Sequence, residues 1–291
     1  MRYALFADLH GRPKALERIM VAAEQAGADE LVCLGDYLEA RVPRRLHDPG
    51  RDWSLPAVVD RDPPLWRRLA TVRRIRGNQE ERIRELLRPE RTPPELAALL
   101  DAPAWARLHG LLALHGHQIR WDPVTGTPPA RLSAEPRPPA ASSLTPRVDP
   151  TPEVDLLVPR AADVPRWPVV VVGHTHQNAV FEIDWPTESA RPAEPPVRMI
   201  SVGSGEALRV PPAPVSPESV SSVGGSAVPV SPATGLPAGG LSGAGGRTLV
   251  VNVGPARGRT QNWLLYDTDR AEICFRTITR LRKESKRARS E

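Results

Sequence analysis

Aromatic residues and cysteines are scarce in this 291-residue chain, and long apolar runs are missing. Only 4% of the residues are Phe, Trp or Tyr, and the cysteines are Cys33 and Cys274. No apolar run approaches the roughly 20 residues of a membrane-spanning helix. The first residues, MRYALFADLHG, lack the apolar region and cleavage site of a signal peptide. We therefore expect a cytoplasmic protein with two free thiols and without a disulfide framework.

Excess charge is also scarce outside the last residues of the chain. The segment RLRKESKRARSE at 280–291 contains six Lys or Arg and two Glu, so it carries +4 of the net +5 of the chain. We interpret 279–291 as a basic tail that makes at most a weak contact with nucleic acid. The rest of the chain is close to neutral, which argues against a large nucleic-acid-binding surface.

Apolar segments alternate with helical patterns at the start of the chain, as in a βαβ unit. A strand, RYALFA, is followed by Leu16, Ile19, Met20 and Ala23 at helical spacing, and then by the apolar strand 31–34. Further helices are predicted at 65–72, at 80–87 and over 93–108 with a break near Pro103. Further strands are predicted at 72–76, 169–172, 179–183, 197–202, 247–253, 262–267 and 271–278, and a strand that runs into a turn is predicted at 111–117.

Two segments have a different composition. Residues 122–168 are rich in Pro and Ala, with a short apolar run, Leu156 to Val158, as a candidate strand, and residues 209–246 are of low complexity. We interpret 122–168 as a Pro-rich insertion and 209–246 as a surface insertion. The chain is then a single domain over 1–278 with two insertions and the basic tail.

Polar residues that bind metals follow the apolar strands. The motifs are Asp8-x-His10, Gly35-Asp36, Gly77-Asn78, His115-Gly116-His117 and Gly173-His174-Thr175-His176. Five of the seven histidines of the chain belong to this set. In open α/β sheets, ligands bind beyond the carboxyl ends of the strands. The sequence therefore predicts that these side chains meet in one metal site.

The residue types indicate which metals the site prefers. Imidazole and carboxylate ligands without a thiolate suit Mn²⁺, Fe or Zn²⁺ in a catalytic site. Residues i and i+2 of a strand point to the same face, so Asp8 and His10 are expected to project together. Two cations about 3.5–4 Å apart need a shared anionic ligand, and Asp36 is the natural candidate.

The order of these motifs resembles that of the calcineurin-like metallophosphoesterase superfamily, and most closely its small bacterial and archaeal phosphodiesterases. The resemblance covers about 1–120, 168–184 and 247–278. It implies an α/β fold, a four-layer α-β-β-α sandwich of two mixed β-sheets flanked by helices. The segment NVGPARGRTQNWLLYD resembles the family's late strand-turn-strand, with its turn at 252–258, and 200–205 is an alternative for that turn.

The resemblance also implies roles for individual residues. One metal would be held by Asp8, His10, Asp36 and His176, and the second by Asp36, Asn78, His115 and His174. Asp36, Asn78 and His115 would be the catalytic residues among them. The metals would be two divalent transition-metal ions, with Mn first and Fe, Zn, Co or Ni as alternatives. Arg12 and His117 are candidates for substrate binding; the alternative is a solvated residue at a helix start for Arg12 and simple packing for His117.

One departure from the family pattern bears on the substrate. Many relatives have His after Gly-Asn to protonate the leaving oxygen, whereas this chain has Gln79, which cannot act as a general acid. We therefore expect a phosphodiesterase that acts on a small phosphorylated substrate through a metal-activated hydroxide. The alternatives are a nuclease, a nucleotide or protein phosphatase with the same centre, and a non-catalytic scaffold of the same fold.

Overall fold

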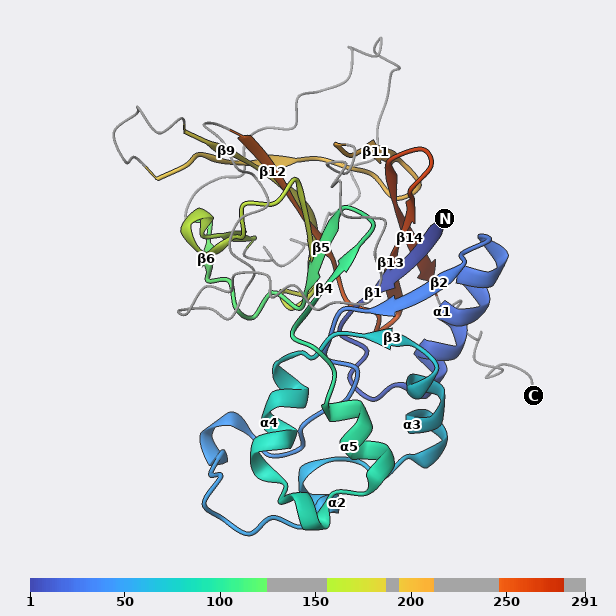
Figure 1. Cartoon of the computed structure of the whole chain (residues 1–291), viewed down its shortest axis with the longest axis vertical. Helices are drawn as coiled ribbons and strands as arrows, with labels where there is room; N and C mark the ends of the chain where they lie inside the picture. The colour runs from blue at the N-terminus through green and yellow to red at the C-terminus, as the bar shows by residue number, and fades with distance from the viewer. Residues whose placement is uncertain (125–155, 187–193, 212–245, 280–291) are drawn as a thin grey trace, which may run out of the picture.

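Two six-stranded β-sheets form the centre of the structure, a computed structural model that describes residues 1–124, 156–186, 194–211 and 246–279. In Figure 1 the two sheets lie in the upper part of the molecule, and helices α3 (Pro63–Ala70), α4 (Asn78–Leu86) and α5 (Pro94–Leu100) gather below them. Most of the predicted insertions 122–168 and 209–246, and 280–291 of the tail, lie outside the described residues. Their interpretation, and with it the division of the chain, stays a prediction.

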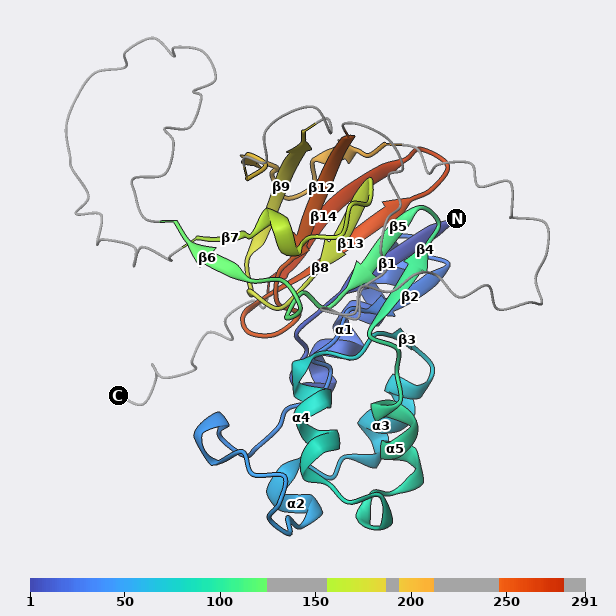
Figure 2. The same cartoon turned by 60° about the vertical axis from the view of Figure 1, so that its left-hand side comes forward.

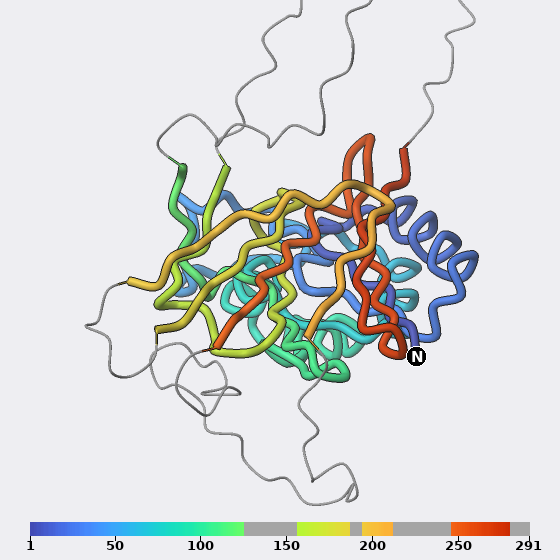
Figure 3. Tube along the Cα trace, turned by 90° about the horizontal axis from the view of Figure 1, so that it is seen from above, coloured from blue at the N-terminus to red at the C-terminus, as the bar shows by residue number. Residues whose placement is uncertain are grey.

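The first sheet has the strand order β11-β14-β13-β1-β2-β3. Strands β1, β2 and β3 run parallel, and β13, β14 and β11 are antiparallel to their neighbours. Figure 3 shows the C-terminal hairpin, in red, alongside the N-terminal strand, in blue. The strands are β1 (Arg2–Phe6), β2 (Glu30–Cys33), β3 (Arg73–Arg74), β11 (Ala207–Arg209), β13 (Thr260–Asp267) and β14 (Glu272–Thr279).

The second sheet has the order β10-β9-β12-β8-β5-β4. Its central strands β5, β8 and β12 are parallel, and β9, β10 and β4 pair antiparallel at the sides. The strands are β4 (Trp105–Leu108), β5 (Leu111–Leu114), β8 (Val169–Val172), β9 (Asn178–Trp185), β10 (Val197–Ile200) and β12 (Gly246–Val253). Both sheets are therefore mixed, as the sequence predicts.

Helices α1, α3 and α5 start at prolines and α4 starts at Asn78. Helix α1 lies against β13 and β14, whereas α3 and α4 pack on α5, and the apolar side chains of these helices share one cluster with Phe6 of β1. Helix α1 begins with Pro13 and buries Leu16 and Ile19, and α3 is capped by the side chain of Asp62, which accepts from the N–H of Leu65. The α-helices are α1 (Pro13–Gln25), α2 (Leu55–Val58), α3 (Pro63–Ala70), α4 (Asn78–Leu86) and α5 (Pro94–Leu100); the 3₁₀ turns are η1 (Arg44–Leu46), η2 (Pro89–Arg91) and η3 (Ala161–Asp163). Among the helices of the described residues, none has the length and apolar character needed to cross a membrane.

Alternation along the strands assigns side chains to different layers. In β1, Leu5 packs between the two sheets, while Phe6 packs against the helices. In β8, Val171 packs between the sheets, and Val172 packs on the outer face of the second sheet. Period-two alternation of apolar side chains produces this division. It fixes the orientation of the residues that follow each strand.

The outer face of the second sheet is covered differently from the expectation of helices on both outer faces. Within the described residues, its cover comes from η3, from apolar side chains such as Trp167, and from the two-stranded ribbon of β6 (Trp121–Pro123) and β7 (Leu157–Pro159). Figure 2 shows this ribbon beside the sheet. The sandwich of two mixed sheets is confirmed, and in the part of the chain that the structure describes the fourth layer is made mainly of irregular chain.

The predicted helix over 93–108 is wrong in its second half. Helix α5 ends at Leu100, and Trp105–Leu108 forms strand β4, which pairs antiparallel with β5. The turn between β4 and β5 contains His109 and Gly110, whose φ angles are 42° and 92°. Two consecutive positive φ angles produce a tight hairpin, and this pairing overrides the helical preference of the segment.

Candidate metal centre

The predicted ligands lie at the carboxyl ends of parallel strands in both sheets. Asp8 follows β1 and Asp36 follows β2, and these two strands are parallel neighbours. His115 follows β5 and His174 follows β8, which are parallel neighbours in the second sheet. Parallel neighbours end at the same edge of a sheet, so each sheet brings its polar residues to one edge. The two edges meet where the sheets pack.

The backbone of these residues has an unusual conformation. In the described part of the chain, seven residues other than glycine have a positive φ, and five of them are predicted ligands. They are Asp8 (58°), His10 (51°), Asp36 (51°), His174 (74°) and His176 (59°). Such a conformation costs roughly 1–3 kcal/mol per residue and persists only where surrounding structure enforces it. This concentration of strained residues marks the strand ends as a functional site.

Two glycines allow the ligand-bearing segments to approach one another. A Cβ atom on Gly77 would lie 2.4 Å from Oδ1 of Asp36. A Cβ atom on Gly35, whose φ is 103°, would lie 2.6 Å from Nδ1 of His115. Any other residue at either position would displace a predicted ligand. Steric crowding at these two positions therefore explains why the motifs contain glycine there.

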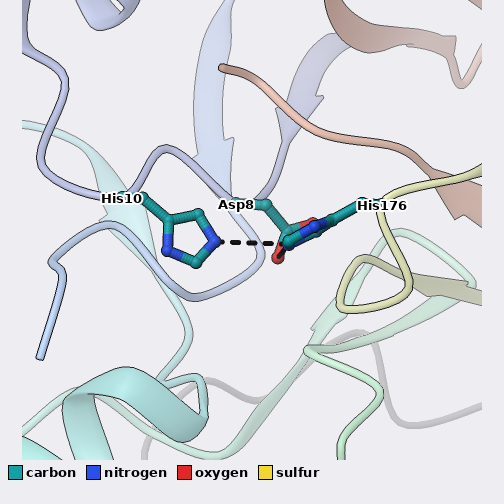
Figure 4. Close-up of side chains that lie close together, drawn as sticks. All are labelled: Asp8, His10 and His176. Atoms are coloured by element: carbon teal, nitrogen blue, oxygen red, sulfur yellow. Dashed lines mark hydrogen bonds and ion pairs between the residues drawn. The ribbon is translucent and has the colours of Figure 1, made fainter. Parts of the chain in front are cut away.

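Asp8, His10 and His176 form the first group of candidate ligands (Figure 4). Nε2 of His10 lies 3.3 Å from Nε2 of His176, and Nε2 of His176 lies 3.5 Å from Oδ1 of Asp8. Asp8 and His10 are buried, and His176 is more exposed. Two imidazole nitrogens and a carboxylate that face one another are a donor set that fits a divalent transition metal.

Asp8, Asp36 and His115 form the second group, and all three are buried. Nε2 of His115 lies 3.3 Å from Oδ1 of Asp36, 4.0 Å from Oδ1 of Asp8 and 3.2 Å from Oδ1 of Asn78. Oδ2 of Asp36 lies 3.9 Å from Nε2 of His10 in the first group. Asp8 thus belongs to both groups, and the two oxygens of Asp36 face different groups.

His174 completes the set of seven predicted ligands. Its ring centroid lies 5.2 Å from that of His115, and its backbone N–H donates to Oδ2 of Asp8 at 3.0 Å. Each of the seven predicted ligands therefore contacts at least one other member of the set. These residues are Asp8, His10, Asp36, Asn78, His115, His174 and His176. Their convergence agrees with the motif prediction, and their individual roles as ligands stay predictions.

Neighbouring charges give the imidazoles of this site different pKa values. Burial would lower the pKa of His115, but the charge and hydrogen bond of Asp36, helped by Asp8, raise it to about 10. Burial would raise the pKa of Asp36, but His115 outweighs it, and the pKa of Asp36 is well below its usual range. Burial and the charge of His115 lower the pKa of His174 to about 4.

Glu80 is a buried carboxylate that supports the segment after β2. It accepts hydrogen bonds from the backbone N–H groups of Asp36, Leu38 and Gly77 at 2.9, 2.8 and 2.9 Å. Burial and the charge of Asp36 raise the pKa of Glu80 to about 8, although the N–H groups of Leu38 and Gly77 oppose this rise. The first-turn carboxylate of α4 thus fixes the backbone at Asp36 as well as the helix start.

Glu39 is a functional candidate that the sequence did not indicate. Its Oε2 lies 2.5 Å from Nδ1 of His10. A carboxylate accepts only, so His10 carries a proton on Nδ1 and directs the lone pair of Nε2 toward the first group. Burial would raise the pKa of Glu39, but the hydrogen bond to His10 lowers it. The only sequence signal was its position three residues after Asp36.

His117 lies beside the two groups without belonging to either. Its ring centroid is 5.4 Å from that of His115, and its Nε2 lies 3.0 Å from Oε2 of Glu81. Glu81 also faces Nε of Arg76 at 3.5 Å. Nδ1 of His117 is buried without a partner among the described residues. Both alternatives for His117, substrate contact and packing, stay open.

Arg12 has a less specific position. It precedes α1, and its side chain is exposed. Its backbone carbonyl accepts from Ala15 and Leu16, and the described residues provide no contact between its side chain and the two groups. The substrate-binding role of Arg12 stays a prediction.

The late turn at 252–258 contacts the site, whereas 200–205 contacts β14. The side chain of Asn252 donates to the hydroxyl of Thr175, which lies between His174 and His176. The N–H of Gly205, by contrast, donates to the carbonyl of Phe275 at 2.8 Å. Of the two alternatives, the position of 252–258 is the one that brings a turn to the predicted ligands.

Comparison with known proteins agrees with this geometry. A sequence model of the calcineurin-like phosphoesterases matches residues 1–178. The match exceeds half of the chain, so the chain belongs to the calcineurin-like phosphoesterase family. It is accordingly a metal-binding hydrolase that acts on phosphoric ester bonds.

Solved structures of similar fold come from bacteria and archaea. A metallophosphoesterase from Sphaerobacter thermophilus has 14% identity and a TM-score of 0.47, with 96% of this chain and 89% of that chain covered. The E. coli phosphoesterase Yfce has 18% identity and a TM-score of 0.33, with 92% and 90% covered. An archaeal phosphodiesterase has 9% identity and a TM-score of 0.37, with 96% and 99% covered. No curated protein matches the chain.

Proposed function

We propose that this protein is a dinuclear metal-dependent phosphodiesterase. The observation that carries the proposal is the position of Asp36 between the two groups of candidate ligands. One oxygen of its carboxylate faces His115 at 3.3 Å, and the other faces His10 at 3.9 Å. Asp8 also belongs to both groups, through its Oδ1, whereas Asp36 turns a different oxygen toward each group. A shared anion is the ligand that two neighbouring cations need.

The donor atoms support divalent transition metals, with Mn²⁺ first. In this proposal the first cation would be held by Asp8, His10, Asp36 and His176, and the second would be held by Asp36, Asn78, His115 and His174. Carboxylate and amide oxygens together with imidazole suit Mn²⁺, and the described site contains no thiolate. Such cations supply charge neutralisation for the phosphate and lower the pKa of a bound water toward about 7.

The chain's own residues supply orientation. Glu39 holds the proton of His10 on Nδ1, and the carbonyl of Leu34 lies 2.9 Å from Nδ1 of His115 and holds its proton there. In both residues Nε2 is then directed toward the site. Phosphoryl transfer depends mainly on positioning and electrostatic stabilisation, so this rigid orientation is the protein's principal contribution.

Gln79 supports a diester as the substrate. It occupies the position of the leaving-group acid of many relatives, and an amide does not donate a titratable proton. Its side-chain oxygen accepts from the N–H of Ala40 at 3.1 Å, so it is already part of the structure that holds the loop after β2. A diester with a stable leaving group depends least on protonation.

The test is hydrolysis by protein that is stripped with a chelator and reloaded with Mn²⁺. We expect an activated phosphodiester to be cleaved faster than the matched monoester, and both faster than single-stranded DNA or RNA. Asp8→Asn, in both groups, should abolish the metal-dependent rate, while Asp122→Asn on the exposed strand β6 should preserve it. Absence of metal-dependent hydrolysis of every ester would overturn the proposal; preferential cleavage of nucleic acid would favour the nuclease alternative.

A further inference from the structure

The turn between β12 and β13 is fixed against the strand end that carries Asp8. The N–H of Ala256 donates to the carbonyl of Ala7 at 2.8 Å, and Pro255 bridges to Ala7. Ala256 is fully buried. Ala7 directly precedes Asp8, so these contacts hold the backbone at Arg257 close to the candidate ligands before any substrate arrives.

The side chain of Arg257 reaches the first group but is only weakly held there. One guanidinium nitrogen lies 3.4 Å from Nδ1 of His176, and another lies 3.9 Å from Oε2 of Glu39. Among the described residues these two long contacts are its polar contacts, and the side chain is 36% exposed. A guanidinium has five N–H donors, so Arg257 has unused donors beside the metal ligands.

The contact between Arg257 and His176 depends on the tautomer of the imidazole. A guanidinium donates only, so the contact is favourable only when Nδ1 of His176 accepts. A His176 that ligates a cation through Nε2 keeps its proton on Nδ1, and two donors then face each other. Cation binding at the first group therefore removes this acceptor and leaves the donors of Arg257 available for an anion.

We propose that Arg257 is a substrate-binding residue that donates to a non-bridging oxygen of the substrate phosphate on the side of His10 and His176. The inference rests on the proposed function, which places a phosphate at these ligands. Arginine pairs with phosphate oxygens through parallel N–H groups and keeps its charge at any working pH. The expected ligand on this side of the site is therefore an oxyanion, and the proposed function makes it a phosphate.

Other arginines near the site are less suitable for this role. Arg76 donates to the carbonyl of Ala102 at 2.9 Å and faces Glu81. Arg82 donates to the carbonyl of Val42 and to Oε1 of Gln79. Their donors hold the chain itself in place, whereas those of Arg257 do not.

The test uses the full chain loaded with Mn²⁺ and inorganic phosphate as the probe. Arg257→Ala removes the guanidinium, Arg257→Lys keeps the charge without the planar fork, and Arg259→Ala removes an exposed arginine of the same turn as a control. Calorimetry should show phosphate affinity about 10- to 100-fold weaker in Arg257→Ala, which corresponds to one lost charge-assisted hydrogen bond. Arg257→Lys should recover part of the loss, and Arg259→Ala should equal the wild type.

Manganese content is the second readout, and we expect it to be unchanged in Arg257→Ala. A fall in manganese content would overturn the inference, because Arg257 would then position His176 rather than bind substrate. Equal phosphate affinity in Arg257→Ala and wild type would also overturn it while leaving the proposed function intact. If manganese-loaded wild-type protein neither binds phosphate nor cleaves esters, the proposed function fails, and this inference fails with it.

Discussion

The site has two flanks, each built from an imidazole, a carboxylate and an arginine. On one flank Glu39 lies 2.5 Å from His10 and 3.9 Å from Arg257. On the other, Glu81 lies 3.0 Å from His117 and 3.5 Å from Arg76. The residue types are the same, but His10 belongs to a group of candidate ligands and His117 does not. The function of each trio therefore depends on what its imidazole faces.

The two arginines carry the same charge but differ in how many of their hydrogen-bond donors are already used. Arg76 donates to a backbone carbonyl and supports the chain near α5, whereas Arg257 makes only long contacts. The same pair of charges thus stabilises structure on one flank and leaves guanidinium donors unused on the other. The role of an arginine near a site therefore depends on how many of its hydrogen-bond donors are free to bind a ligand.

The largest effect is expected at Asp36, whose two carboxylate oxygens face the two groups of candidate ligands. Asp36→Asn keeps the shape of the side chain but removes the anion between the two groups. Because two close cations then repel without a shared anion, we expect at least one metal to be lost and the rate to fall by about three orders of magnitude or more. Metal analysis by mass spectrometry and the rate of diester cleavage test this, and two bound metals with near-normal turnover would disprove the assignment.

A smaller effect is expected from the carboxylates that distinguish the flanks. Glu39→Ala removes the acceptor that orients His10, and loss of such a partner typically costs about 10- to 100-fold in metal affinity. Glu81→Ala, the matched variant on the other flank, should leave manganese affinity nearly unchanged. Calorimetric titration of both variants with Mn²⁺ checks the comparison. Equal losses in both would mean that the flanks are equivalent.

The pH dependence of metal binding sharpens the contrast between His115 and His174. The pKa of His115 is raised to about 10, so in metal-free protein it is protonated at neutral pH, and a cation at Nε2 must displace that proton. The pKa of His174 is lowered to about 4, so it contributes no proton. Manganese affinity should therefore rise about tenfold per pH unit between pH 6 and 8. Titrations in buffers of different ionisation enthalpy should give about one released proton at pH 7, and none would contradict this prediction.

The smallest effect is expected at Gln79, outside both flanks. Gln79→Ala should retain both metals, because the side chain faces Ala40 rather than the ligands. It should lower the free energy of unfolding by about 1 kcal/mol through the lost hydrogen bond. Urea denaturation of metal-free protein measures this loss. A loss of manganese from this variant would show that the loop after β2 controls the ligands more strongly than proposed.

Much of the site was predictable because strands and motifs coincide. Each predicted ligand lies just after an apolar strand or begins the next helix. The order of the motifs was therefore enough to predict that these seven side chains lie close together. The packing of two mixed sheets was implied by the family resemblance, and the wholly apolar run of β8 indicated a buried strand. These features can be read from residues that are close together in the sequence.

The residues that were missed depend on contacts between distant segments. Glu39 and Arg257 are far apart in the chain, and neither follows an apolar strand directly, so only the packing of the β12–β13 turn reveals their meeting. The strand Trp105–Leu108 was predicted as helix because its residues suit both states. Its partner strand and the left-handed turn at His109 and Gly110 decided the outcome.

The proposed function requires that Asp36 lies between two cations. Crystals grown with Mn²⁺ and measured at the manganese absorption edge test it directly through the anomalous difference map. We expect two peaks about 3.5–4 Å apart, with the carboxylate of Asp36 in contact with both. A single peak, or two peaks that do not share Asp36, would contradict the dinuclear site and the mechanism built on it.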